Sequence, residues 1–356
     1  MKMLFFSGAE IDGFFFVLLA FCFSCLLSSF LNSFKSFSPT FIYLTLFIAI
    51  IYVFAHSNKQ LCDYLVVSAF IGTILFLFVF IFKYHNELIH LNFSRLGGEF
   101  GDENDIALFN SIGLTISFYY LLYSKNLIVK ILSLPLGLLF AFCGLASGSK
   151  IIIVIFAIMS IFCLVRKNGM KKWWLSIIEL SLLIGLIILL FSLPAFETIR
   201  TRFLSMINLF TDKKIDGTFR DGSTITRFYM IVDGIQLFLR KPLLGFGLGG
   251  FASRGGIMNV WSHNHLSEML CNTGIVGFVL YHLPLIYSLK FIGKDRKYEK
   301  YLMLIVLFFV QMISVALTSE KFFAFLIGVV YGKLIETKCL IKIKPIKIKT
   351  FRESCC

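Results

Sequence analysis

The sequence has few charged residues for its length. Only 15% of its 356 residues are Asp, Glu, Lys or Arg, whereas a soluble domain carries about 25%. Hydrophobic residues make up 58% of the chain and the mean hydropathy is +0.86. These values exclude a cytosolic globular protein. Polar interruptions are short throughout, and residues 196–262 form the only polar segment of any size, so no separate soluble domain is expected.

Patterns of metal-ligating residues are also missing. The nine cysteines show no ligand spacing, and Cys22 and Cys25, although separated by only two residues, lie inside an apolar run. We interpret the cysteines as small buried apolar side chains. Clustered carboxylates at 99–105 offer oxygen ligands to a divalent cation, but they contain no Asp-x-Asp pair. We therefore favour a solvated or sugar-contacting loop there, and we expect neither a metal nor another cofactor.

What the sequence does have is apolar runs of about 20 residues, the length that crosses a bilayer. They predict an all-α polytopic membrane protein with about ten transmembrane helices, in which 1–356 form a single membrane domain. The first run is not followed by a small-x-small cleavage site, so we expect an uncleaved span. The predicted spans are 14–31, 40–55, 63–83, 108–122, 127–147, 151–166, 174–194, 263–289, 302–318 and 322–336.

The positions of the basic residues predict the orientation of these spans. Short basic loops stay in the cytoplasm, and ten spans place all three basic clusters on one side. Both termini are then cytoplasmic, with the basic tail 337–356 against the anionic inner leaflet. The acidic loop 84–107 and the large loop 196–262 are then periplasmic. The net charge of +14 is accounted for in this way, and no nucleic-acid partner is expected. The basic clusters lie at 166–172, 290–300 and 342–349.

The large loop 196–262 is itself basic, with nine Lys and Arg against five Asp and Glu. An external surface rich in Arg favours a phosphate or pyrophosphate partner, although a solvated basic loop is the alternative. Its run 225–240 repeats apolar residues at helical spacing and predicts a short amphipathic helix that ends before Pro242. Gly245 and Gly247 follow as a tight turn facing a ligand or the membrane. They do not form a dinucleotide site, because no strand precedes them.

Two histidines stand where the next predicted span begins. If Ser262 caps this helix, His263 takes its first position, where the helix dipole favours the neutral, proton-accepting imidazole. At about 100° per residue, Gly274 and Gly277 lie within about 40° of His263. They predict a stripe of small residues on which a neighbouring helix packs. His265 faces away and is a weaker candidate. The alternative is that the histidines only mark the membrane interface.

These residues resemble a signature of the O-antigen ligase and O-antigen polymerase superfamily, integral membrane glycosyltransferases that use undecaprenyl-pyrophosphate-linked glycans. The resemblance covers about 146–290. At one position the chain has Lys150 where the family usually has Arg, which keeps the charge but loses the bidentate fork. The resembling motifs are Ala146-Ser-Gly-Ser-Lys150, Thr226-Arg227 followed by Pro242-Leu-Leu-Gly245-Phe-Gly247, and His263-Asn264 followed after nine residues by Gly274-x-x-Gly277.

The resemblance implies a GT-C-type helical fold in the cell inner membrane, with a periplasmic active site. It implies metal-independent transfer of a glycan from a lipid pyrophosphate to an acceptor hydroxyl. Positioned cations stabilise the leaving pyrophosphate in such a reaction, and Arg227 is the first candidate. His263 takes or orients the proton of the attacking hydroxyl. The further substrate-binding candidates are Arg220, Lys150, Arg95, Asn264, Gly245 and Gly247.

Three functions remain open. The favoured one is a polymerase that joins undecaprenyl-pyrophosphate-linked oligosaccharides, working among membrane lipids and with a chain-length regulator protein. A ligase that moves finished polysaccharide onto the lipid A core carries the same motifs. The third is a transporter of lipid-linked oligosaccharides, which would place its functional charges at the bilayer midplane. In this sequence the polar groups gather instead at the outer rim. The sugar composition and the oligomeric state have no recognisable residue pattern.

Overall fold

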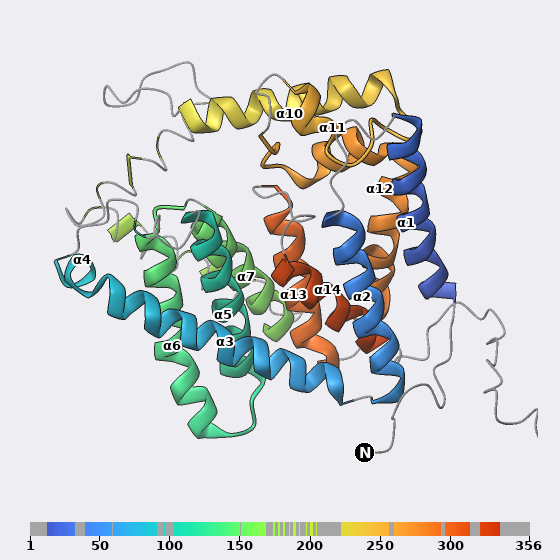
Figure 1. Cartoon of the computed structure of the whole chain (residues 1–356). Coiled ribbons are helices and arrows are strands. Elements are labelled where there is room, and N and C mark those ends of the chain that lie inside the picture. The colour runs from blue at the N-terminus through green and yellow to red at the C-terminus, as the bar shows by residue number, and fades with distance from the viewer. Residues whose placement is uncertain are drawn as a thin grey trace, which may run out of the picture. The chain divides into compact units, whose positions relative to one another are not determined.

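The computed structural model describes most of the chain. The described residues are 13–32, 40–58, 60–90, 96, 103–149, 151–168, 222–255, 260–292, 296–313 and 321–334, with isolated helical positions between 174 and 204. Every regular element among them is a helix (Figure 1), which confirms the predicted all-α class. The predicted span 174–194 is described only at isolated positions, and the basic tail 337–356 lies outside the described residues.

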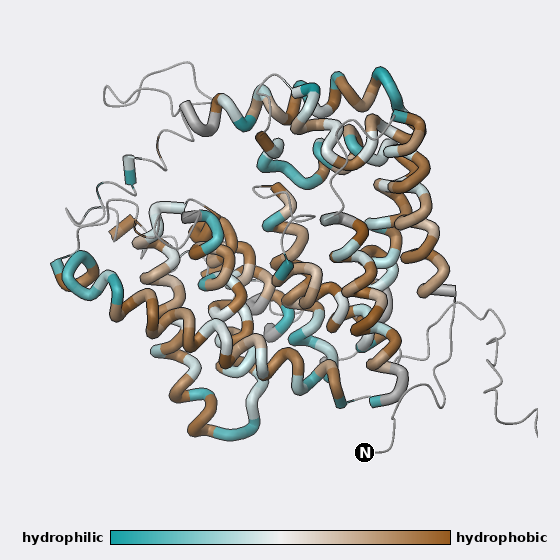
Figure 2. The backbone as a smooth tube through the Cα atoms, in the orientation of Figure 1, coloured by the Kyte–Doolittle hydropathy of each residue, from teal (hydrophilic) through white to brown (hydrophobic). Residues whose placement is uncertain are grey.

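The long helices coincide with predicted spans and are apolar over most of their length (Figure 2). Four of them are long and apolar enough to cross a membrane: Leu61–Lys83, Asn104–Tyr123, Leu127–Ala146 and His265–Leu289. Shorter apolar helices occur at Phe15–Leu31, Ile42–Ala55 and Ile151–Phe162. These features confirm a polytopic membrane protein. The helices are α1 (Gly13–Leu31), α2 (Thr40–Ser57), α3 (Leu61–Lys83), α4 (His85–Ile89), α5 (Glu103–Tyr123), α6 (Leu127–Ala146), α7 (Ile151–Asn168), α10 (Gly222–Arg240), α11 (Gly250–Arg254), α12 (His265–Ile292), α13 (Glu299–Gln311) and α14 (Lys321–Leu334).

The chain forms two compact units. The first contains Met1–Val67, Arg227–Phe308 and Met312–Cys356, and the second contains Ser68–Thr226 and Phe309–Gln311. In the second unit, α5 packs against α6 and α7. The Phe140 ring of α6 is fully buried there, and it lies directly against Gly113 of α5, where a side chain would collide with it.

Helix α5 has buried polar side chains, which need hydrogen-bond partners in an apolar environment. Several bond to carbonyl groups of the preceding helical turn. Asn110 Nδ2 donates to Ile106 O at 2.8 Å, and Thr115 Oγ1 donates to Ser111 O at 2.7 Å. The Ser111 hydroxyl also accepts a hydrogen bond from Gln311 Nε2 at 3.1 Å. This local bonding lets a membrane-length helix carry Ser, Thr and Asn in the protein interior.

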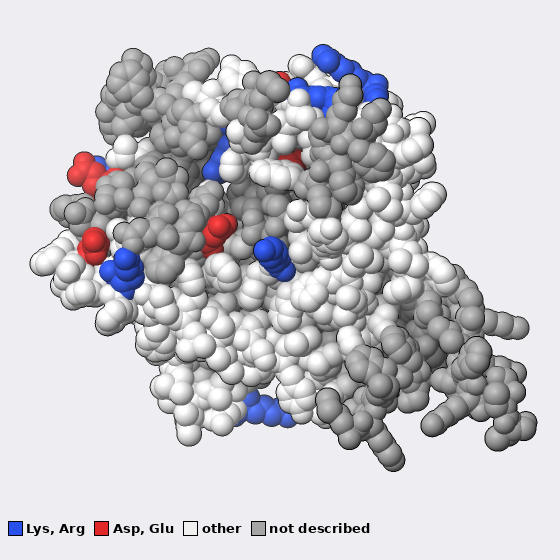
Figure 3. Space-filling view, viewed as in Figure 1, with Lys and Arg blue, Asp and Glu red and all other residues white. Residues whose placement is uncertain are grey.

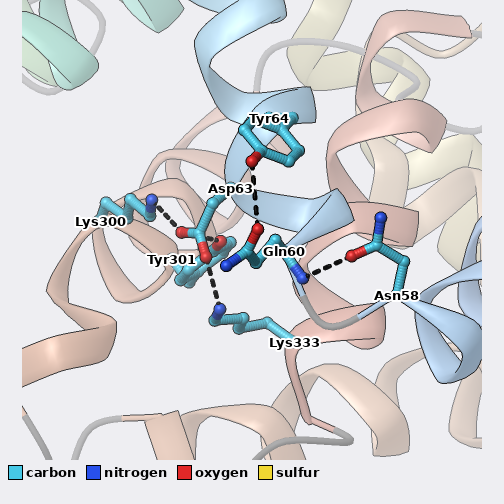
Figure 4. Close-up of polar contacts among 7 residues, drawn as sticks. All are labelled: Asn58, Gln60, Asp63, Tyr64, Lys300, Tyr301 and Lys333. Atoms are coloured by element: carbon cyan, nitrogen blue, oxygen red, sulfur yellow. Dashed lines mark hydrogen bonds and ion pairs between the residues drawn. The ribbon is translucent and has the colours of Figure 1, made fainter.

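In the first unit, one carboxylate connects three helices (Figure 4). Asp63, in the first turn of α3, forms ion pairs with Lys300 of α13 and with Lys333 of α14, the second at 2.7 Å. It also accepts a hydrogen bond from Tyr301 Oη at 2.8 Å. The start of α3, the start of α13 and the end of α14 therefore lie together. The charge-based topology requires the segment before α13 and the segment after α14 to lie on one side.

Replacing Asp63 with Ala is expected to destabilise the first unit. Lys333 is only 3% exposed, and it would lose its carboxylate partner while remaining buried. A buried charged group without a partner costs about 1–3 kcal/mol or more, so the melting temperature of the purified protein in detergent should fall by several degrees. Lys125→Ala, at an exposed position, is the control. A melting temperature of Asp63→Ala equal to that of the wild type would contradict this role.

Candidate functional site

The candidate site is built around a break in α12. Gly274 has φ +63° and ψ −169°, which is not helical. In a regular helix, the amides of Ile275 and Val276 would bond to the carbonyls of Cys271 and Asn272. The break separates these two pairs and leaves four backbone groups in need of partners. Such groups are costly to leave unpaired inside a membrane protein.

The loop that follows α10 supplies all four partners. Phe246 N donates to Cys271 O and Gly247 N donates to Asn272 O, both at 2.9 Å. In the other direction, Ile275 N donates to Pro242 O at 2.8 Å and Val276 N donates to Leu243 O at 3.2 Å. The loop 242–247 is thus inserted into the break, and it replaces two helical hydrogen bonds with four.

The glycines of the motif are explained by this close approach. Gly245 has φ +69°, and a Cβ atom there would lie 2.6 Å from Cys271 O. A Cβ atom on Gly274 would collide with the backbone of Leu243, and one on Gly277 would collide with the Thr273 side chain. The predicted stripe for a neighbouring helix stays a prediction, and the structure gives these two glycines a different use. Gly274 makes room for the inserted loop, and Gly277 makes room for a side chain of its own helix.

The C-terminal end of α1 holds the same loop from the other side. Ser28 Oγ donates to Leu244 O, and Asn32 Nδ2 donates to Gly245 O at 3.2 Å. Leu248 N donates to Ser29 Oγ at 3.1 Å. Gly247, at φ +89°, passes so close to α1 that a Cβ atom would lie 3.0 Å from Ser29 Cα. A contact of Gly245 or Gly247 with substrate stays a prediction.

Asn272 connects the break to the short helix α11. Its side-chain Oδ1 accepts a hydrogen bond from Phe251 N at 2.8 Å, while its carbonyl accepts from Gly247 N. The sequence motifs do not point to Asn272, Ser28 or Asn32. The available signal is their polarity: each is a hydrogen-bonding residue within or at the end of an otherwise apolar run.

The turn that carries His263 differs from the predicted geometry. Helix α12 begins at His265, and His263 precedes it with φ +52°. Asn264, not Ser262, caps the helix, because Asn264 Oδ1 accepts a hydrogen bond from Ser267 N at 2.9 Å. Asn is as good a cap as Ser, and the Ser262 hydroxyl accepts instead from Asn264 N at 3.1 Å. The expectation that His263 occupies the first helical position is therefore wrong.

Two buried contacts fix this turn. Glu268 is fully buried, and its Oε2 accepts hydrogen bonds from both Ser262 N and Ser262 Oγ at 2.9 Å. On the other side, the end of α13 contributes two carbonyls. His265 N donates to Met312 O at 2.9 Å, and Asn264 Nδ2 donates to Ile313 O at 3.2 Å. The half-buried His263 side chain is thus carried by a backbone that is held on both sides.

The weaker candidate, His265, points into the protein. Its ring is fully buried and lies 5.2 Å from the Tyr281 ring, 5.3 Å from the His282 ring and 6.1 Å from the Phe308 ring, between centroids. Among the described residues, neither ring nitrogen of His265 has a hydrogen-bond partner. That His265 faces away from His263 stays a prediction.

The cationic candidates are only partly described. Arg227 is half-buried on α10, two helical turns before Gly234 and on the same face. A Cβ atom on Gly234 would lie 3.0 Å from Ser267 Cβ, so this face of α10 packs on the first turn of α12. Arg220, Lys150 and Arg95 lie outside the described residues. Two further cations stand over the Phe246 ring, Lys241 at 5.0 Å and Arg254 at 4.9 Å.

Metal ligands are not clustered in the described part of the chain. No group of three or more His, Cys, Asp or Glu residues there is placed to hold a metal ion. Residues 99–102 of the acidic stretch lie outside the described residues.

The inserted loop predicts a strong contrast between two glycine substitutions. Gly245→Ala places a side chain at a positive φ, which costs about 1–2 kcal/mol, and against the carbonyl of Cys271. We expect the melting temperature of Gly245→Ala to be several degrees lower than that of the wild type. Unfolding is monitored by tryptophan fluorescence, because Trp261 precedes the His263 turn. Gly72→Ala, inside α3 and with nothing within 4 Å, should leave stability unchanged or raise it by up to about 1 kcal/mol. Equal melting temperatures of the two variants would argue against the insertion.

Comparison with known proteins gives one family match, over part of the chain. Residues 135–282 match the family model described as O-antigen ligase. No curated protein matches the chain. The matched region includes α10, the inserted loop, the His263 turn and the break at Gly274. The match supports a relationship of this chain to the O-antigen ligase and polymerase superfamily, which is a group of membrane enzymes. The match does not distinguish the polymerase branch from the ligase branch.

Proposed function

We propose that this protein is an O-antigen, or surface polysaccharide, polymerase. It transfers the growing undecaprenyl-pyrophosphate-linked glycan onto a lipid-linked repeat unit, on the periplasmic side of the inner membrane and without a metal. The observation that carries the proposal is the conformation of His263. In the described part of the chain it is the one non-glycine residue with a positive φ. Strained backbone of this kind costs about 1–3 kcal/mol and clusters at functional sites.

The surroundings of His263 suit a general base. Its neighbours Ser262 and Asn264 are buried and hydrogen-bonded to Glu268 and to the end of α13, whereas the His263 side chain is half-buried. A fixed backbone with an accessible imidazole holds a catalytic group in position before the substrate arrives, which lowers the entropic part of the barrier. A neutral imidazole can accept a proton near neutral pH.

The proposed step is a displacement at the anomeric carbon of the donor glycan. The acceptor hydroxyl oxygen forms the new glycosidic bond, and the bond from that carbon to the pyrophosphate oxygen breaks. The hydroxyl proton passes to the His263 imidazole, and undecaprenyl pyrophosphate leaves with the bonding electrons. Negative charge grows on the leaving group, and Arg227 stabilises it. Arg220, Lys150 and Arg95 are proposed as further phosphate contacts.

The ligase alternative uses the same residues with a different acceptor, the lipid A core. We favour the polymerase because that branch is the more numerous and varied. The proposed topology places both termini in the cytoplasm, and a chain-length regulator protein is a proposed partner. A transporter without chemistry is the third possibility, but the polar groups of the His263 turn lie at the start of α12 and not at mid-helix.

Loss of either proposed catalytic side chain should abolish transfer. In vesicles containing purified protein and a purified lipid-linked glycan, His263→Ala and Arg227→Ala should each lower the transfer rate at least about 100-fold, the lower end for general acid-base catalysis. His85→Ala and Arg240→Ala, at exposed positions, are the matched controls and should retain the wild-type rate. If His263→Ala and Arg227→Ala both retain full transfer, the proposed site is wrong.

Deletion of the gene should distinguish the three functions. Surface lipopolysaccharide and lipid-linked intermediates from the deletion strain are separated on a gel. We expect a core that is capped by a single repeat unit, because the other assembly steps continue without the polymerase. Bare core with long polymer left on the carrier lipid would instead show a ligase. Single repeat units held inside the cell would show a transporter.

A further inference from the structure

Helix α10 has two apolar faces, and in the part of the chain that the structure describes only one of them is buried. Met230 and Leu237 are buried and pack with Phe246, Phe251 and Cys271. The opposite side of the helix is also apolar, but it is exposed. Phe228 is 59% exposed, Ile235 44% and Leu239 68%.

These exposed residues form a regular stripe. At about 100° per residue, Phe228, Ile235 and Leu239 fall within about 40° of one another, with the half-buried Val232 beside them. Leu237 lies about 160° from Leu239 on the same helix. A solvated helix would carry polar residues on its outer face, so the stripe needs a partner.

The end of α10 is fastened to the end of a lipid-facing helix. Lys241 Nζ donates to Asn32 Oδ1 at 2.6 Å, directly after the last turn of α1. Close in sequence to this contact, Phe30 and Leu31 of α1 are exposed, and so are Leu239 of α10 and Leu243 of the following loop. Figure 1 shows α10 running across the ends of α1 and α12, and Figure 2 shows apolar segments along it. Exposed apolar residues of a membrane span and of α10 therefore lie on either side of the Lys241–Asn32 contact.

Charged and aromatic residues flank the stripe in the pattern of an interfacial helix. Arg240 and Lys241 stand beside it, and Lys and Arg atoms gather at this end of α10 in Figure 3 (upper right). Tyr229 lies at the edge of the stripe and is exposed. Cations beside an apolar face pair with anionic lipid headgroups, and Tyr favours the headgroup level.

We propose that α10 lies in the plane of the membrane, with Phe228, Val232, Ile235 and Leu239 among the acyl chains of the leaflet next to the His263 turn. The inner face of the same helix packs on the first turn of α12 through Gly234. Bilayer lipid thus contacts one side of the helix whose other side supports the candidate site. This placement does not depend on the reaction that the site performs.

The test uses a photo-reactive benzophenone amino acid in the full-length protein in phospholipid vesicles. It replaces Phe228, Ile235 or Leu239 in turn, and adducts are identified by mass spectrometry after irradiation. Arg240 is the matched control for depth: it is exposed and adjacent to Leu239 but about 100° away around the helix, at the headgroup level, where few adducts to the acyl chains should form. Phe23 of α1, 67% exposed, is the positive control for lipid contact. We expect several-fold more phospholipid adducts at the three stripe positions than at Arg240.

Three results would overturn the proposal. Phospholipid adducts at the stripe positions no more abundant than at Arg240, with adducts present at Phe23, would show a solvated helix. Cross-links from the stripe to a second copy of the chain would show an oligomer interface. Cross-links to other segments of the same chain would show an internal packing surface. The three stripe positions are independent, so one variant that fails to fold leaves two that decide.

Discussion

The insertion of the loop 242–247 into the break of α12 is the interaction on which the candidate site depends. Four hydrogen bonds join the two segments, through the carbonyls of Cys271 and Asn272 and the amides of Ile275 and Val276. A helix inside a membrane protein cannot leave such groups unpaired, so the break at Gly274 and the inserted loop require each other. The same loop is hydrogen-bonded to the end of α1. The loop, the break in α12 and the end of α1 thus form one joint, built from three separate parts of the sequence.

The joint has a direct consequence for the residues before α12. The first turn of that helix is packed against α10 at Gly234, and the preceding turn is bonded to the end of α13 and to the buried Glu268. His263 is therefore carried by a backbone that is anchored on each side, and its positive φ is sustained by those anchors. A rigid scaffold of this kind suits the reaction proposed above, in which the protein fixes the position of the catalytic group.

Polar interactions in the described residues concentrate where helices begin and end. Asp63 holds two lysines where α3 and α13 begin and α14 ends, and the His263 turn joins the start of α12 to the end of α13. Between these points the helices are largely apolar, which is consistent with a bilayer as solvent. Polar residues within the helices, such as Asn110 and Thr115, donate hydrogen bonds to backbone carbonyls of the preceding turn of the same helix. Helix α10 is also apolar between its ends, with one apolar face toward α12 and one outward.

The sequence by itself determined the helical class, the positions of most spans and the amphipathic helix before Pro242. These follow from hydropathy and from local residue preferences, which act over a few turns of chain. The tertiary structure decided why the glycines are needed, that Asn264 caps α12, and that Asn272, Ser28 and Asn32 belong to the site. Apart from the Asn264 cap, whose hydrogen bond with Ser267 is local, those properties depend on hydrogen bonds between separate segments, such as Phe246 with Cys271 and Asn32 with Gly245. A hydropathy pattern carries no information about which distant carbonyl will accept a given amide, because that pairing exists only after the helices have packed.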